Sequence, residues 1–255
     1  MILNKPKISP IKLNTSNSIM IFTIKKIKYI LLFIPLIFLS LNYSSAEHIT
    51  KAVVDNSITS NQKAESIFFK LNIKDLDIVT FKAAYKGYLK LENKGKLKNK
   101  ILSVIDFSKS SNKERMFVID MQKQELKYQT LVSHGKYSGE EFADKFSNIL
   151  NSNKSSIGFY LTAETYSGKH GHSLRLDGME ASNDAARNRA IVMHGADYAT
   201  FDFIKKHGRL GRSQGCPALP PIISAKVINL IKEGSCLFIY YPSEEYLNNS
   251  LLLKA

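Results

Sequence analysis

The chain has 255 residues, of which 44% are hydrophobic, and its 36 basic and 22 acidic side chains give a net charge of +14 at neutral pH. This length and composition indicate a globular protein with one sizeable core and exclude an intrinsically disordered chain. The basic residues are scattered and no nucleic-acid-binding motif accompanies them. We therefore expect a solvated basic surface and no nucleic-acid partner.

Residues 1–46 have the pattern of an export signal. Three lysines between positions 25 and 28 precede an apolar run over residues 29–41, and Ser44 and Ala46 form a small-x-small cleavage site. The apolar run is shorter than the roughly 20 residues that span a bilayer. We predict cleavage after Ala46, with membrane contact only during export, and a true translation start at Met20. Cleavage removes six lysines and no acidic residue, which leaves 30 basic and 22 acidic side chains and a net charge of +8.

Residues 47–100 are predicted to form a leader and a helical N-terminal segment. The leader is polar and unpatterned, whereas residues 64–71 carry apolar side chains at helical spacing. Asp77 is a candidate N-cap for a second helix. It precedes apolar residues at helical spacing, which are Ile78, Phe81, Ala84, Tyr85, Tyr88 and Leu89. We expect this aromatic stripe to pack on the neighbouring domain.

From residue 101 the pattern changes to that of β-strands. Short runs of β-branched or aromatic residues predict strands over residues 101–108, 115–120, 125–134, 157–164, 173–176, 190–194 and 236–241. Gln122–Gln124 is the predicted turn of a hairpin. Helices are predicted over residues 199–207 and 221–233, each followed by a glycine. The predicted fold class is α+β, mainly β, with the main domain over residues 101–244 and a C-terminal tail over residues 245–255.

The two cysteines lie in different surroundings. Cys236 lies in an apolar predicted strand, where a thiol behaves as a small apolar side chain. Cys216 lies in a polar turn next to a glycine. An exported chain can form a disulfide. A disulfide between Cys216 and Cys236 would consume the reactive thiol of Cys216, so we predict two free cysteines.

Cys216 and His194 together indicate thiol-dependent acyl transfer. A cysteine attacks as the thiolate, and a nearby imidazole lowers the pKa of the thiol. Gly215 permits a tight turn in which the N–H groups of Gly215 and Cys216 can stabilise an oxyanion. Ser213 can hydrogen-bond back across that turn. Because Pro217 keeps Cys216 extended, we assign activation of the thiol to His194 rather than to a helix dipole.

The segment Ile191–Gly195 is followed by Ser213–Cys216, and Pro217 and Ala218 come directly after the cysteine. These motifs, in this order, resemble the signature of the YkuD-type L,D-transpeptidases, enzymes of peptidoglycan cross-linking, and of the branch known as murein L,D-transpeptidase catalytic domain proteins. Further segments similar to that branch lie at residues 134–135, 158–160, 164–166, 168–171, 173–176, 208–212 and 238–242. The resemblance covers residues 101–242 and implies a YkuD-like, strand-rich catalytic domain.

The resemblance implies that Cys216 is the nucleophile, that His194 is its base, and that the carbonyl of Gly195 completes the triad. Better-known members of the family have a polar or basic residue two places after the cysteine, where this chain has Ala218. We expect Arg212 or Arg189 to supply the substrate contact that this alanine cannot make.

The resemblance also implies the substrates, which are two peptidoglycan stem peptides, one the acyl donor and the other the acceptor. Attack on the diaminopimelate carbonyl of a tetrapeptide stem would release D-alanine, and the second stem would complete a 3→3 cross-link in the periplasm or cell wall. Two alternatives stay open: an L,D-carboxypeptidase, in which water resolves the acyl-enzyme, and an inactive wall-binding module. A cysteine peptidase acting on proteins has no local signature here.

Other polar and aromatic residues are weaker candidates. His170, His172 and Asp177 are metal-ligand types, but their spacing offers no frame for a complete site, so we expect no metal and no cofactor. Tyr160 is assigned to substrate binding, while Tyr166 and other strand-end residues, His134 among them, fit either the cleft or the core.

Overall fold

The computed structural model describes residues 60–254, so the predicted export signal and the start at Met20 lie outside the described residues. The fold is an eight-stranded mixed sheet with packed helices, which confirms the predicted α+β, mainly β class. No helix within residues 60–254 has the length and apolar character needed to cross a membrane. The strands are β1 (Ile101–Asp106), β2 (Met116–Asp120), β3 (Glu125–Thr130), β4 (Gly158–Gly168), β5 (Gly171–Gly178), β6 (Val192–Gly195), β7 (Ala218–Leu219) and β8 (Cys236–Tyr240).

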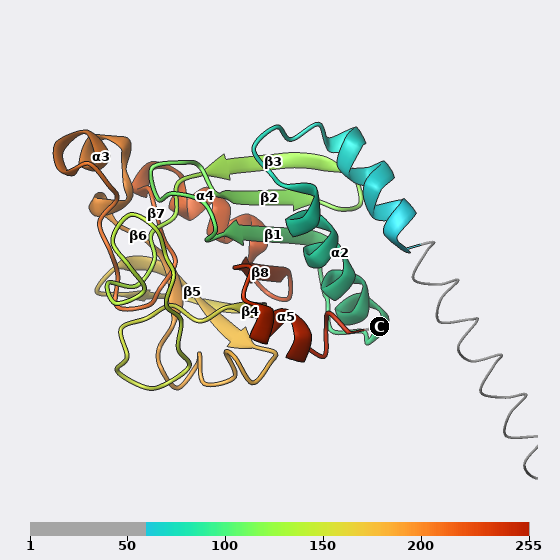
Figure 1. Cartoon of the computed structure of the whole chain (residues 1–255). Coiled ribbons are helices and arrows are strands. Elements are labelled where there is room, and N and C mark those ends of the chain that lie inside the picture. The colour runs from blue at the N-terminus through green and yellow to red at the C-terminus, as the bar shows by residue number, and fades with distance from the viewer. Residues whose placement is uncertain (1–59, 255) are drawn as a thin grey trace, which may run out of the picture. The chain divides into compact units, whose positions relative to one another are not determined.

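The described residues begin in a helix that runs over residues 60–71. The other helices are α2 (Ile78–Asn93), the 3₁₀ turn η1 (Asp197–Ala199), α3 (Phe201–His207), α4 (Pro221–Ile231) and α5 (Glu244–Asn249). In Figure 1, α2 lies beside β1, and it also packs on β8, whereas α3, β6 and β7 lie at the far end of the sheet.

The strand order is β3-β2-β1-β8-β4-β5-β6-β7. The pairs β1–β8 and β6–β7 are parallel, and the other neighbours are antiparallel. Every residue of the central strands β1 and β8 is buried. This burial explains why β8 reads as a continuous apolar run and why only Ser103 and Asp106 interrupt the run of β1, because a strand covered on both faces has no solvent side to show alternation.

Helix α2 is part of the same core as the sheet. Asp77 caps it as predicted, because its carboxylate accepts from the backbone N–H of Val79 at 2.7 Å. Its aromatic stripe, Phe81, Tyr85 and Tyr88, is buried in one cluster with side chains of β1 and β8. The stripe therefore packs as expected, and no boundary between two cores falls at residue 100.

Several boundaries differ from the sequence predictions for tertiary reasons. The expected strand over residues 125–134 ends at Thr130, because the next residues leave β2 and reach the far edge of the sheet. Strand β7 was not predicted, since two residues carry no period. The predicted tail contains helix α5, whose Tyr246 is buried in the core. Strands β4 and β5 extend to a two-residue connection, Lys169–His170.

Residues 133–135 join the two ends of the sheet. Ser133 bridges Ala218 of β7, and Gly135 bridges Ser213 in the turn before it. The chain that leaves edge strand β3 thus pairs with the chain around β7. This closure places residues 133–135 directly behind the turn that contains Cys216.

Candidate active site

A cavity of about 580 Å³ opens between β6, the β4–β5 turn and the loop after residue 135. Cys216 and His194 both line it. The structure thus brings together the two residues that the sequence singled out, although 22 positions separate them. The remaining lining residues are Lys136, Asn151, Asn153, Tyr166, Lys169, His170, Arg189, Ala190, Ile191, Val192, Tyr198, Arg212, Ser213 and Gln214.

The turn that carries Cys216 is held by Ser213. The hydroxyl of Ser213 donates to the carbonyl of Cys216 at 2.6 Å and accepts from the N–H of Gly215 at 3.0 Å. Gly215 has φ of +126°, and a Cβ there would stand 2.8 Å from the carbonyl oxygen of Lys154. Only glycine fits both the backbone angle and this close approach. The predicted tight turn is therefore present, with Ser213 bonded across it.

The predicted oxyanion site is changed by the same contacts. The N–H of Gly215 donates to Ser213, so it is already used inside the turn. Within residues 60–254 the N–H of Cys216 donates to no backbone carbonyl. An oxyanion at this site would therefore be stabilised by the N–H of Cys216, while Gly215 serves the geometry of the turn.

His194 lies in a row of side chains across the sheet. The register pairs Tyr166 with Ser173, Ser173 with His194, and His194 with Ala218, so the four share one face. The Nδ1 of His194 lies 2.9 Å from the carbonyl oxygen of Gly195. Since a carbonyl only accepts, Nδ1 carries the proton in this contact and Nε2 keeps its lone pair. The contact expected between His194 and Gly195 is present.

The surroundings of Cys216 and His194 favour the neutral form of each. Burial raises the pKa of the Cys216 thiol, although the N–H of Val192 donates to Sγ at 3.4 Å and opposes the shift. Burial lowers the pKa of His194, and the neighbouring His170 and Lys169 lower it further. Both shifts favour the neutral thiol and the neutral imidazole, while the expected imidazole-stabilised thiolate stays a prediction. The Sγ of Cys216 donates to the carbonyl of Ala190 at 3.7 Å, and within residues 60–254 no hydrogen bond joins it to His194.

Arg189 and Arg212 line the cavity, but their guanidinium groups are engaged by the protein. Arg189 donates to the carbonyls of Ser147 and Lys154 at 2.7 and 2.6 Å. Arg212 donates to the carbonyls of Lys136 and Gly139 and pairs with a carboxylate of the same loop. Both arginines therefore hold the loop over residues 136–154 in place, and the substrate contact expected of one of them stays a prediction.

Tyr160 does not reach the cavity. Its side chain is fully buried, and its hydroxyl contacts the carbonyl and the hydroxyl of Ser156 at 2.9 and 2.8 Å. The assignment of Tyr160 to substrate binding is therefore wrong, because β4 turns this residue into the core. Ala218 is also fully buried, and its strand partners are His194 and Ser133. Neither Arg189 nor Arg212 therefore occupies the position that Ala218 holds in the sheet.

His134 belongs to a buried polar cluster behind the nucleophile turn. Its Nδ1 accepts from the guanidinium of Arg115 at 2.8 Å, and its backbone carbonyl accepts from the N–H of Ser213 at 2.9 Å. Burial and the charge of Arg115 lower the pKa of His134 to about 3. Arg115 is itself fully buried and donates to the carbonyls of Val132 and Lys109. The cluster supports the turn from inside the core.

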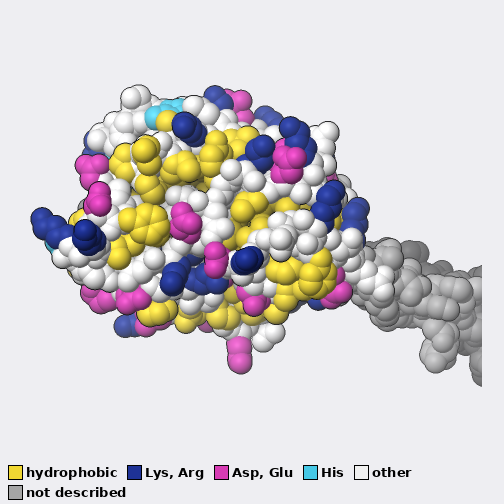
Figure 2. All heavy atoms as spheres, turned by 90° about the horizontal axis from the view of Figure 1, so that it is seen from above, with side chains coloured by type: hydrophobic (Ala, Val, Ile, Leu, Met, Phe, Trp, Pro, Cys, Tyr) yellow, Lys and Arg dark blue, Asp and Glu magenta, His cyan; other side chains and the backbone are white. Residues whose placement is uncertain are grey.

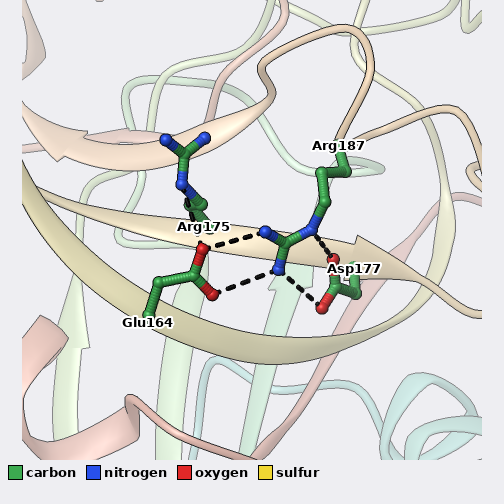
Figure 3. Close-up of polar contacts among 4 residues, drawn as sticks. All are labelled: Glu164, Arg175, Asp177 and Arg187. Carbon is green, nitrogen blue, oxygen red and sulfur yellow. Dashed lines mark hydrogen bonds and ion pairs between the residues drawn. The ribbon is translucent and has the colours of Figure 1, made fainter.

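The opposite wall of the cavity is supported by ion pairs on the surface. The guanidinium of Arg175 lies over the ring of Tyr166, 4.5 Å from its centroid. Figure 3 shows Arg187 between Glu164 of β4 and Asp177 of β5, with Arg175 beside the same glutamate. These contacts attach the loop that precedes Arg189 to the sheet.

The sequence did not single out Lys136, Lys169 or Tyr198 as site residues. Each lines the cavity from a loop or turn whose position depends on the closed sheet. The only signal was the glycine-rich turn around Lys169 and His170. His170 faces the cavity, whereas His172 contacts Asn229 of α4 at 3.2 Å. Within residues 60–254 no group of three or more histidine, cysteine or acidic side chains is arranged to hold a metal.

A cysteine and a histidine that share a cavity, with the histidine fixed by a backbone carbonyl, define the arrangement used for thiol-dependent acyl transfer. The family described as L,D-transpeptidase catalytic domain matches residues 72–240. The chain belongs to this family, which confirms the resemblance found in its motifs.

Solved structures similar to the chain are also L,D-transpeptidases or cell-shape proteins. The L,D-transpeptidase from Mycobacterium smegmatis is 15% identical with a TM-score of 0.35, and the match covers 56% of this chain and 59% of that one. L,D-transpeptidase 1 of Mycobacterium tuberculosis is 13% identical with a TM-score of 0.33, over 56% and 62% of the two chains. The helical cell shape determining protein Pgp2 from Campylobacter jejuni is 12% identical with a TM-score of 0.37, over 58% and 50%. No curated protein matches the chain.

Proposed function

We propose that the protein is an exported L,D-transpeptidase that joins two peptidoglycan stem peptides by a 3→3 cross-link. The observation that carries the proposal is the shared cavity, in which Cys216 lies near a His194 whose Nδ1 is bonded to Gly195. That bond leaves Nε2 of His194 free to accept the thiol proton. Membership of the family supports the same reaction class.

In the proposed reaction, Sγ of Cys216 attacks the diaminopimelate carbonyl of a tetrapeptide stem while Nε2 of His194 takes the thiol proton. The N–H of Cys216 stabilises the oxyanion of the tetrahedral intermediate. His194 then protonates the leaving amine, the C–N bond breaks, and D-alanine departs to leave a thioester. The side-chain amine of a second stem attacks this thioester, forms the new amide and returns the thiol.

The charge of the cavity supports an anionic peptide substrate. Four basic side chains line it, Lys136, Lys169, Arg189 and Arg212, and no aspartate or glutamate is among the lining residues. The two arginines donate to the protein itself. Within residues 60–254 the Nζ of Lys169 has no acceptor, so it is available for a stem carboxylate. Figure 2 shows a contrasting surface, where basic, acidic and hydrophobic side chains are intermingled.

Two alternatives differ from this proposal in one step each. Hydrolysis of the thioester by water would make the protein an L,D-carboxypeptidase, because attack on the stem and loss of D-alanine are shared. A wall-binding module would use the same cavity without reaction. A cysteine and a histidine in one cavity, with Nδ1 of the histidine bonded to Gly195, favour an enzyme, since binding alone does not need an imidazole with a free Nε2.

The test incubates wild type, Cys216→Ala and Cys236→Ala with purified tetrapeptide muropeptides, and the products are weighed by mass spectrometry. Cys236 is the matched control because it is buried in β8, away from the cavity. We expect D-alanine release by wild type and Cys236→Ala only, and cross-linked dimers outnumbering free tripeptides. Excess tripeptide would identify a carboxypeptidase. Identical products from all three proteins would refute the enzyme and leave the binding module.

A further inference from the structure

The ring of His170 lies on the ring of His194. Their centroids are 4.3 Å apart and their planes differ by 21°, which is a stacked arrangement. His194 is only 2% exposed, although it lines an open cavity, while His170 is exposed. The His170 ring therefore covers one face of the imidazole that the proposed reaction uses.

The sheet leaves room for this stack. The two neighbours of His194 in the cross-strand row, Ser173 and Ala218, have small side chains that do not cover its ring. The β4–β5 turn supplies the cover instead. Gly171 has φ of +71°, and a Cβ on Gly168 would stand 2.7 Å from the ring of Tyr166. These two glycines bring the turn close to Tyr166 and the cavity.

We propose that His170 is a positioning residue, which stacks on His194 and holds the imidazole in the orientation that bonds Nδ1 to Gly195 and leaves Nε2 toward the cavity. The proposal rests on the function proposed above, since it concerns the same imidazole. Without the stack, the ring of His194 has one open face and can rotate away from the carbonyl of Gly195.

The stack also sets the charge state of His194. Burial lowers the pKa of His194, and the neighbouring His170 and Lys169 of the β4–β5 turn lower it further. The Cys216 thiol, Arg189 and the Tyr198 hydroxyl line the same cavity, while β7 pairs Ala218, which does not titrate, with His194. Removing His170 takes away both part of the burial of His194 and the electrostatic effect of this neighbour. Both changes raise the pKa of His194. As the pH falls, the variant without His170 therefore protonates this imidazole at a higher pH than wild type does.

His172 provides a matched control on the same hairpin. Adjacent strand residues point to opposite faces, so His172 lies on the face opposite Ser173 and His194. There it contacts Asn229 of α4 at 3.2 Å. The experiment compares His170→Ala, His170→Phe and His172→Ala in the full chain. The phenylalanine keeps a ring for the stack but cannot carry a charge.

The first measurement is an NMR titration of the histidine Cε1–H signals, with His194 assigned from a His194→Gln variant. We expect the midpoint of His194 to lie below 6.5 in wild type. It should rise most in His170→Ala, less in His170→Phe, and remain unchanged in His172→Ala. An unchanged midpoint in His170→Ala, or an equal rise in His172→Ala, overturns the proposal. No substrate is needed, so this result stands apart from the test of the proposed function.

The second measurement is the pH profile of D-alanine release. A rise of one pKa unit lowers the neutral fraction of a base by up to about tenfold below that pKa. We expect kcat/KM of His170→Ala at about pH 6 to fall by roughly two- to tenfold, with KM little changed. At about pH 8 His194 is neutral in every variant, so a difference in rate there reports the position of its ring. At that pH we expect His170→Ala to be slower than wild type and His170→Phe to recover most of the wild-type rate. A phenylalanine variant as slow as the alanine variant at that pH would refute positioning by the stack.

Discussion

Arg115 and Arg187 each contact several acceptors, but in opposite surroundings. Arg115 is fully buried behind the nucleophile turn, where its acceptors are two carbonyls and His134. The side chain of Arg187 is 44% exposed on the surface behind the other wall of the cavity, between Glu164 and Asp177. Arg187 has two carboxylate partners in Figure 3, while within residues 60–254 Arg115 has no ion pair and is influenced by the carboxyl of Asp106, which has one oxygen without a hydrogen bond.

The comparison shows that the number of ion pairs does not measure their contribution to stability. A surface pair gains little, because water already solvates both charges and salt screens them. A buried cation that loses its contacts leaves carbonyls and a carboxylate without partners or solvent. Burial lowers the pKa of Arg115 to about 9, so it stays charged at neutral pH. The inner wall therefore depends on one residue, whereas the outer wall is supported by several weak contacts.

Arg115→Met should have the largest effect, because it removes the donors to Val132 and Lys109 and leaves Asp106 buried without a counter-charge. We expect a loss of about 3–5 kcal/mol in the free energy of unfolding. Urea denaturation followed by circular dichroism measures it. Arg115→Lys is the control, which keeps the charge and should lose less. A loss below about 1 kcal/mol for the methionine variant would contradict the role of burial.

His134 should make stability depend on pH. Its pKa is about 3 in the folded protein and near its ordinary value of 6.5 when unfolded. The unfolded state therefore binds the extra proton between these values, and stability falls as pH drops from 6.5 toward 3. We expect a loss on the order of a few kcal/mol across this window.

His134→Asn should reduce that pH dependence, because asparagine can still accept from Arg115 but cannot take up a proton. Urea midpoints at about pH 7 and about pH 5 give the comparison, and the readout is the difference between the two rather than either value. His207→Asn is the control, since His207 is exposed at the end of α3. Equal pH dependence in wild type and His134→Asn would assign the effect to other groups.

Arg187→Met should have the smallest effect, because its pairs with Glu164 and Asp177 lie in solvent. We expect a loss of less than about 1 kcal/mol at low salt, and a smaller loss at high salt. Urea denaturation at both salt concentrations measures it. A loss as large as that of Arg115→Met, or one that salt does not reduce, would show that the two walls do not differ as described.

The sequence by itself determined the fold class, the helix after Asp77, most strands and the paired Cys216 and His194. These features depend on short-range signals, which are apolar period, caps and turn residues close in the chain. The geometry of the nucleophile turn was also local, because Ser213, Gly215 and Cys216 lie within four positions. The resemblance to the family predicted the contact between His194 and Gly195, which are also neighbours in the chain.

Tertiary structure decided which residues face the cavity. Tyr160 was assigned to substrate and lies in the core, whereas Lys136 and Lys169 line the cavity from distant loops. The stack of His170 on His194 arises because strand pairing brings a turn 24 residues away over the imidazole. Tertiary structure also decided the pKa shifts of Cys216 and His194, because burial is their largest cause. Composition does not reveal which side chains are buried. Long-range pairing and desolvation depend on the whole fold, so only the folded chain specifies them.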